Sequence, residues 1–292
     1  MRNSNFKSRH RRWLSRAPFA PFAPFASFAS FASLALAALF ACAAICPAPM
    51  LAAGLVTEAA ALKDARKWQA SEQLLRRSVE EEPGSSSYKA LAHLLFITGR
   101  PAEGLPLYRK ALRVDPDDPD AVAGMVECLG DMGRYNQTIE ACERAIKRFE
   151  KDPKATPAIM ARFHLVLAGA QGTAAQKDGV MAMLKYAFSV KKHIDRALEL
   201  DPAYARAVYG LGVYYREAPK VVGGDPAKGL ELLEKAYRLG PDDYGLHQVW
   251  IEALIDEGRK DDARRELARY RKDFAGVAAA EREIDGLKAR LE

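Results

Sequence analysis

A similar six-residue motif occurs twice in the sequence, each time at a predicted helix end. This motif constrains the fold of the chain more than any other feature. Residues 111–116 are Ala-Leu-Arg-Val-Asp-Pro, and residues 197–202 are Ala-Leu-Glu-Leu-Asp-Pro. Each copy follows one amphipathic apolar pattern and precedes another, as expected where one helical hairpin ends and the next begins. Proline after a last helical turn cannot extend that helix. The motif therefore predicts a row of stacked helix pairs.

Glycine residues mark predicted turns between helices at regular distances along the body of the chain. Turns are predicted at Gly99-Arg100-Pro101, Gly133-Arg134 and Gly258-Arg259, because glycine permits the left-handed backbone that closes a helix. Residues 85–118 then form a unit of 34 residues. Apolar residues recur at intervals of three and four, and no alternation typical of strands appears. These signals predict an all-α fold.

Two units are longer than the rest, and added length at one edge of a repeat stack is where specific function tends to be added. Residues 156–204 are expected to contain a break at 169–173 and a long helix from about Gln176 to Leu200. Residues 205–243 carry their surplus at 218–226. The predicted organisation is a leader at 1–53 and a repeat domain at 54–292, with units at about 55–84, 85–118, 119–155, 156–204, 205–243 and 244–277 and a capping helix at 278–292.

The pattern within the units resembles the tetratricopeptide family. The family pattern has a large residue, Leu with a small residue and a large residue on the first helix, then a small, a large and a small residue on the second helix before Pro. The matching positions are Tyr88, Leu91, Ala92, Leu95, Gly104, Tyr108, Ala111 and Pro116, and again Val208, Leu211, Gly212, Tyr215, Gly229, Leu233, Ala236 and Pro241. Small residues at Ala92, Gly104, Gly212 and Gly229 are predicted to let two helices approach closely. The resemblance implies a right-handed superhelical solenoid of antiparallel helix pairs that binds proteins and is not an enzyme.

A narrower resemblance covers about residues 170–270. The segments Leu198–Pro202, Leu211-Gly212, Tyr214-Tyr215, Ala218-Pro219 and Gly223–Asp225 are similar to the T component of tripartite ATP-independent periplasmic transporters. That resemblance implies an envelope protein that partners the transporter's substrate-binding protein and holds an apolar ligand. The first half of the body does not keep this pattern.

The turn at 223–226 has a structural and a functional interpretation. Asp225 is placed as an N-cap with Pro226 at the first helical position, while Gly223 and Gly224 supply unusual dihedral angles. A phosphate-binding loop is the alternative, but the Gly-Lys-Ser/Thr ending of a P-loop is missing. We therefore expect a structural turn.

The leader accounts for the basic charge of the chain. Residues 1–53 contain six basic residues and no acid, which leaves 38 residues of each sign in the body. Nucleic acid is therefore not an expected partner. An uncharged run from Ala17 to Thr57 follows the basic start and predicts export, with the product periplasmic or anchored to the membrane and facing the periplasm. Membrane contact is expected only through this leader or a lipid anchor.

The fate of the leader is left open. Cleavage before Gly54, after Leu51-Ala52-Ala53, gives a soluble exported protein. Acylation of Cys42 in Leu39-Phe40-Ala41-Cys42 gives a lipoprotein, and the apolar run is also long enough to remain as an anchor.

Catalytic and metal-binding patterns are scarce in the body. The histidines at 93, 164, 193 and 247 are dispersed, and no His-Glu-x-x-His, Gly-x-Ser-x-Gly or Cys-x-x-Cys motif is present. Cys128 and Cys142 fall on two helices of one hairpin, where they either fill a helix interface or form a disulfide, and the first is favoured. No enzyme, cofactor or metal site is predicted.

Partner-binding residues are expected on the first helix of each pair, facing the concave side. They are Lys89, His93, Phe96, Glu127, Asp131, Tyr209, Val213, Arg216, Gln248 and Glu252. This mixture suits an extended peptide or a partner's surface, with Phe96 and Tyr209 as anchors. The alternative is a small apolar ligand held in a cleft near Tyr214, Tyr215, Ala218 and Val222.

Overall fold

The computed structural model describes residues 49–178 and 180–292, and the description concerns the compact unit formed by residues 47–292. Residues 1–48, with Cys42 and most of the predicted leader, lie outside the described part. Residues 49–53, which the sequence assigned to the leader, belong to the first described helix. No described helix combines the length and apolar character needed to cross a bilayer.

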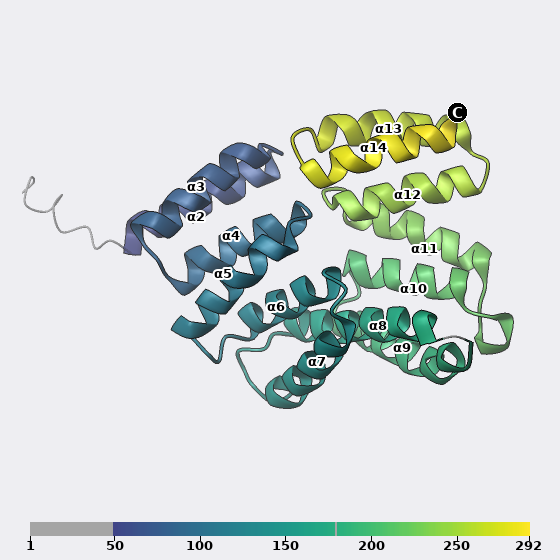
Figure 1. Ribbon diagram of the computed structural model, residues 1–292, viewed down its shortest axis with the longest axis horizontal. Coiled ribbons are helices and arrows are strands. Elements are labelled where there is room, and N and C mark those ends of the chain that lie inside the picture. Colours follow the sequence, from purple (N-terminus) through teal and green to yellow (C-terminus); the bar gives the residue numbers. More distant parts are fainter. Residues whose placement is uncertain (1–48, 179) are drawn as a thin grey trace, which may run out of the picture. The chain divides into compact units, whose positions relative to one another are not determined.

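The described residues form thirteen α-helices and one short 3-10 helix, with no strand among them (Figure 1). The all-α solenoid predicted from the sequence is confirmed. Consecutive helices pair as antiparallel hairpins, and α14 follows the last pair. The elements are α2 (Pro49–Asp64), α3 (Trp68–Glu81), α4 (Ser85–Ile97), α5 (Pro101–Val114), α6 (Pro119–Asp131), α7 (Tyr135–Phe149), α8 (Pro157–Asp178), α9 (Val180–Leu200), α10 (Ala205–Glu217), η1 (Lys220–Val222), α11 (Pro226–Leu239), α12 (Tyr244–Asp256), α13 (Lys260–Asp273) and α14 (Ala278–Leu291).

Three of the hairpins turn in the same way. Gly99, Gly133 and Gly258 have φ angles of +76°, +72° and +71°, as the sequence predicted. The amide after each glycine donates to a carbonyl five residues earlier, for example Arg100 N to Leu95 O at 2.8 Å. Glycine is needed there because a side chain would strain the left-handed backbone.

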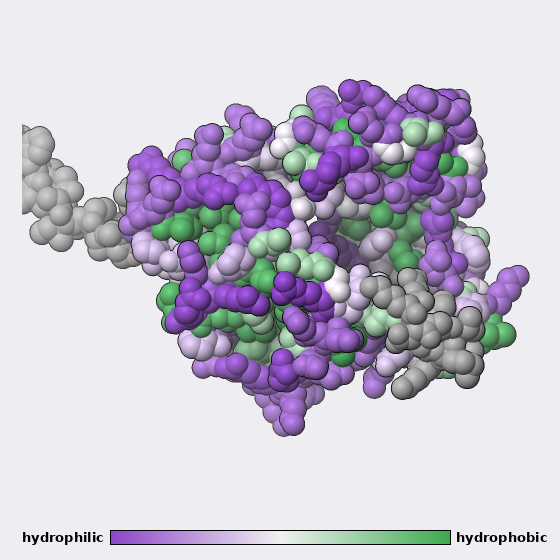
Figure 2. All heavy atoms as spheres, viewed as in Figure 1, coloured by the Kyte–Doolittle hydropathy of each residue, from purple (hydrophilic) through white to green (hydrophobic). Residues whose placement is uncertain are grey.

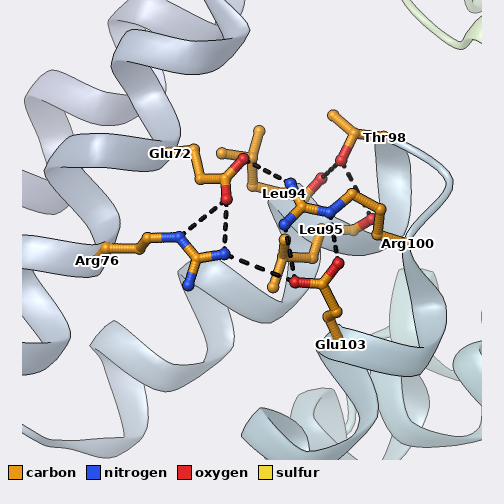
Figure 3. Close-up of polar contacts among 7 residues, drawn as sticks. All are labelled: Glu72, Arg76, Leu94, Leu95, Thr98, Arg100 and Glu103. Atoms are coloured by element: carbon orange, nitrogen blue, oxygen red, sulfur yellow. Dashed lines mark hydrogen bonds and ion pairs between the residues drawn. The ribbon is translucent and has the colours of Figure 1, made fainter. Parts of the chain in front are cut away.

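Polar side chains fasten the first hairpin to the second (Figure 3). Arg100 donates to Glu72 on α3 at 2.7 Å and to both carboxylate oxygens of Glu103 at 2.7 Å. Arg76 also donates to Glu72, at 2.9 Å. Although burial acts to raise it, the hydrogen bonds from Arg100 and Arg76 lower the pKa of Glu72. The turn between α4 and α5 is therefore anchored to the preceding hairpin.

Small residues sit where helices cross most closely. A Cβ on Gly104 would lie 2.9 Å from the carbonyl oxygen of Ala92, which is itself fully buried. A Cβ on Gly229 would lie 2.8 Å from the carbonyl oxygen of Gly212. The predicted close approach at these positions is confirmed, because backbone meets backbone with no room for a side chain.

The break predicted at residues 169–173 is wrong. Helix α8 runs without interruption through this segment, and the helix expected from Gln176 begins at Val180. Glycine in a helix interior costs about 1 kcal/mol relative to alanine. That cost is outweighed because Leu167, Ala168 and Ala170 on the same stretch are buried.

The first and last hairpins are in contact, which the sequence did not indicate. The rings of Trp68 and Phe274 stack with centroids 6.1 Å apart, and Trp68 Nε1 donates to the carbonyl of Asp273 at 3.3 Å. Arg66 forms ion pairs with Asp242, at 2.6 Å, and with Asp273. Arg66 adopts a left-handed φ of +58°, the one positive value outside glycine among the described residues. These contacts join residues about 200 positions apart.

The face drawn in Figure 2 is mostly hydrophilic, with patches of hydrophobic residues visible among the hydrophilic ones. One apolar cluster includes residues of both the first and the last hairpins, from Ala59 on α2 to Leu291 on α14. Further clusters fill the interfaces between successive hairpins. The core therefore follows the stack and continues across the contact between its two ends.

Candidate partner-binding groove

A cavity of about 680 Å³ opens along the first helices of the hairpins. Helices α4, α6, α8, α10 and α12 contribute to its walls, and α9 adds a further side. We call this cavity the groove. Its volume lies within the range of roughly 300–1,000 Å³ that is typical of ligand-binding pockets.

Aromatic side chains form much of the groove wall. They are Phe96, Tyr135, Tyr186, Tyr204, Tyr209, Tyr214 and Tyr244. Burial raises the pKa of Tyr204, Tyr209 and Tyr244. These phenols therefore stay neutral at physiological pH, and each offers an apolar ring with one polar group, the combination enriched at protein interfaces.

Charged side chains beside the groove link α4, α6 and α8, the first helices of three successive hairpins. Lys89 on α4 pairs with Asp118 at 2.8 Å and Asp120 at 3.1 Å. Arg162 on α8 binds Asp120 at 2.6 Å and both carboxylate oxygens of Glu127 at 2.8 and 2.7 Å. Burial acts to raise the pKa of Asp120, but the hydrogen bond from Arg162 lowers it. This network fixes the relative positions of α4, α6 and α8.

Arg206 joins α10 to α12 within the groove. Its Nε donates to Asp243 at 2.6 Å, and its guanidinium lies 5.1 Å from the ring centre of Phe96. The other oxygen of Asp243 caps α12 by accepting from the backbone of Gly245 and Leu246. One carboxylate therefore both starts a helix and holds the arginine, so that neither charge is left unpaired.

The groove brings together six of the ten side chains predicted for the concave face. They are Phe96, Glu127, Asp131, Tyr209, Val213 and Gln248. The other four lie outside the lining. Lys89 belongs to the network with Asp118 and Asp120, Arg216 donates to Asp256 at 3.1 Å, and Glu252 accepts from Gln248 at 3.1 Å. His93 is exposed, yet the surrounding protein desolvates it enough to lower its pKa.

Other groove residues were missed from the sequence. Arg206 and Asp243 lie 37 positions apart, and the apolar wall of Leu165, Val190 and Ile194 comes from the unit of irregular length. The position of Asp243 ahead of a helix was the available signal for a cap, but nothing local indicated its arginine. Of the residues proposed for an apolar cleft, Tyr214 and Ala218 line the groove, whereas Tyr215 and Val222 do not.

The turn at 223–226 has the structural role expected from the sequence. Gly223 has a φ of +94°, and a Cβ on Gly224 would lie 1.8 Å from the carbonyl oxygen of Ala218. Asp225 caps α11 by accepting from the amide of Lys228 at 3.2 Å, and Pro226 is the first helical residue. Tyr214 Oη donates to the carbonyl of Val222 at 2.7 Å and ties the turn to α10.

The two body cysteines are both free and buried, so the interpretation of Cys128 and Cys142 as interface residues is confirmed. Burial raises the pKa of each thiol to about 12. Among residues 49–178 and 180–292, no three or more His, Cys, Asp or Glu side chains are grouped so as to hold a metal ion.

Two histidine positions were not anticipated. His164 and His193, which the sequence treated as dispersed, place their Nδ1 atoms 3.0 Å apart across α8 and α9. His247 is fully buried and lies 3.2 Å from Glu266.

Comparison with models of protein families identifies the repeats. Two tetratricopeptide-repeat models match residues 56–122 and 223–291. The chain carries tetratricopeptide repeats. Residues 90–221, which overlap the first of these matches, match the model of regulator of microtubule dynamics protein 1-3, and this match covers less than half of the chain.

One curated relative and two solved structures match this chain. A CTR9 homolog of Arabidopsis thaliana is 25% identical over 156 residues, which are 53% of this chain and 13% of that protein. The chain thus spans about an eighth of that relative. A tetratricopeptide-repeat protein of Thermus thermophilus, TTC0263, matches with a TM-score of 0.55 at 18% identity, over 70% of this chain and 99% of that one. The Cut9-Hcn1 structure matches with a TM-score of 0.54 at 15% identity, over 82% of this chain and 43% of that one. These two matches show the fold.

Proposed function

We propose that this tetratricopeptide-repeat protein is a non-enzymatic scaffold that binds an extended segment of a partner protein in the groove. The observation that carries the proposal is a cavity of about 680 Å³ whose walls come from several successive first helices and are rich in tyrosine. A long groove of this kind can hold several residues of an extended chain at once.

Ion pairs within the protein position the helices that form the groove, so the groove is preformed. A preformed groove favours binding. The pairs of Lys89, Arg162 and Arg206 with carboxylates hold α4, α6, α8, α10 and α12 in place. A preformed site loses less conformational entropy on binding than a mobile one. Tyr209 is the aromatic anchor that we assign to the partner segment, whereas Phe96 is buried and packs against Arg206.

Site-specific photo-cross-linking in cells tests this proposal. A photoreactive phenylalanine analogue at Val213, inside the groove, should give a covalent adduct with a partner protein. The same analogue at Phe188, which is 70% exposed on α9 and does not line the groove, is the matched control. Tyr209→Ala should abolish the adduct formed at position 213. Equal adducts from both positions, or adducts that survive Tyr209→Ala, would contradict binding in the groove.

A small apolar ligand is the second candidate, and one observation favours it. The groove lining includes the apolar side chains of Leu165, Val190, Ile194 and Val249. Native mass spectrometry of gently purified protein should then show a bound mass that is lost on denaturation. Protein that is empty in several preparations would rule this candidate out.

The envelope location and the transporter partner are proposals that rest on the sequence. The basic start and apolar run of residues 1–53 support export to the periplasm. Fractionation of cells, with mass spectrometry of the mature N-terminus, would distinguish cleavage before Gly54, acylation of Cys42 and a retained anchor. Co-purification of a transporter's substrate-binding protein would support the role as a T component, and its absence from purified complexes would count against that role.

A further inference from the structure

The charged residues of the groove do not balance. Among the described residues that line it, Glu127, Asp131, Glu217 and Asp243 are acids and Arg206 is the single base. Glu127 is paired with Arg162, and Asp243 is paired with Arg206. The groove is left with two carboxylates, Asp131 and Glu217, for which the described part of the chain records neither a hydrogen bond nor an ion pair.

Asp131 occupies an unfavourable place for an acid. It is the last residue of α6, where the helix dipole presents its negative end, and Glu127 lies one turn before it on the same helix. Asp131 is exposed to solvent, yet the surrounding protein desolvates it enough to raise its pKa, and the charges of Glu127 and Asp243 act in the same direction against the attraction of Arg206. Arg206 does not satisfy Asp131, because its guanidinium is held by Asp243 at 2.6 Å and by the ring of Phe96.

Aromatic rings line the same groove as this carboxylate. Tyr209 and Tyr244 are among these residues. Burial raises the pKa of Tyr244, and the charge of Asp131 acts in the same direction. Glu217, the last residue of α10, repeats the arrangement of an unpaired acid at the end of a first helix. A cationic side chain would find both an opposite charge and aromatic faces in such a site.

We propose that the groove selects partner segments carrying a lysine or arginine, whose charge pairs with Asp131, beside an apolar residue that packs on Tyr209. The inference rests on the proposed function and specifies the chemistry of the partner. A basic segment would relieve the excess negative charge of the groove, whereas an acidic segment would add to it.

A random peptide library displayed on phage, selected on the purified protein, is the test. We expect lysine or arginine next to aromatic or aliphatic residues to be enriched. A peptide synthesised from the enriched sequences should bind Asp131→Asn about tenfold more weakly, and its affinity should fall with added salt. Asp285→Asn is the matched control, because Asp285 is exposed on α14, away from the groove, and the substitution is the same. It should leave binding unchanged.

A stability measurement separates a binding role from a structural one. Removing a charge that is unfavourable in the free protein should raise the melting temperature of Asp131→Asn above that of the unaltered protein, while binding weakens. A structural role for Asp131 would lower both. Enrichment of acidic or uncharged peptides, or binding unchanged in Asp131→Asn, overturns the inference and leaves groove binding intact. A library that yields no enriched sequence overturns the inference and the proposed function together.

Discussion

Single residues decide where backbones can meet in this protein. Gly224 is the tightest described case, because a Cβ there would lie 1.8 Å from the carbonyl oxygen of Ala218. Gly169 is the opposite case, since nothing lies within 4 Å of the Cβ that it lacks. Glycine is thus required at one position and tolerated at the other.

The pair gives a matched prediction. Gly224→Ala should lower the free energy of unfolding by about 1–3 kcal/mol, because the backbone of the turn must move to admit the methyl group. Gly169→Ala should raise it by about 0.5–1 kcal/mol, since alanine is the better helix former and meets no obstacle. Urea unfolding of both variants measures the two effects, and a similar destabilisation in both would contradict the geometry.

His247 makes stability depend on pH. Burial lowers its pKa below the ordinary value of 6.5, against the opposing effect of Glu266. The folded state therefore binds a proton less readily than the unfolded state. This share of stability is complete above about pH 6.5 and is lost as the pH falls toward the lower folded-state pKa.

His247→Leu should flatten this dependence. The free energy of unfolding should decrease less between pH 7.5 and 5.5 in the variant than in the unaltered protein. Part of the decrease will remain, because His93, His164 and His193 also have lowered pKa values. An unchanged slope in urea unfolding at these pH values would show that His247 does not titrate as its burial requires.

At the scale of one element, α11 depends on its first residue. The Asp225 side chain accepts from the amide of Lys228, and Pro226 begins the helix. Asp225→Ala should cost about 1 kcal/mol of unfolding free energy, because an amide of the first turn loses its acceptor. Glu231→Ala, an exposed position on the same helix, should change it by less than about 0.5 kcal/mol. Equal losses in thermal or urea unfolding would argue against a cap.

At the scale of the whole repeat domain, the contact between the first and last hairpins is the feature that sequence analysis did not anticipate. Arg66 pairs with Asp242 and Asp273, and its guanidinium lies 5.9 Å from the ring centre of Phe274. Its left-handed φ of +58° is a conformation that glycine adopts without strain. Replacement by glycine would therefore remove the charge while suiting the backbone.

Arg66→Gly should loosen the first hairpin selectively. Amide hydrogen exchange in α2 and α3 should become faster, because the ion pairs that hold them to the last hairpin are gone, while exchange in α6 and α7 stays the same. Arg144→Ala, which removes an exposed ion pair with Glu140 on α7, should leave α2 and α3 unaffected. Unchanged exchange in α2 and α3 of Arg66→Gly would falsify the importance of this contact.

Features that depend on a few neighbouring residues could be predicted from the amino-acid sequence. The turns at Gly99, Gly133 and Gly258 need a left-handed residue, and the start of α11 needs Asp225 before Pro226, so each is encoded locally. Periodic apolar positions determined the helical hairpins in the same way. The prediction failed at residues 169–173, where burial of the helix outweighed the local preference of glycine.

Contacts between distant side chains became known from the folded structure. Arg206 with Asp243 and His164 with His193 are pairs that no local pattern indicates. The same holds for Arg66 with Asp273 at the contact between the two ends of the stack. The physical reason is that each hairpin turns slightly against its neighbour, and small rotations added over six hairpins determine which side chains share the groove and whether the ends touch. Those rotations are determined by the packing of whole interfaces, which a stretch of a few residues does not contain.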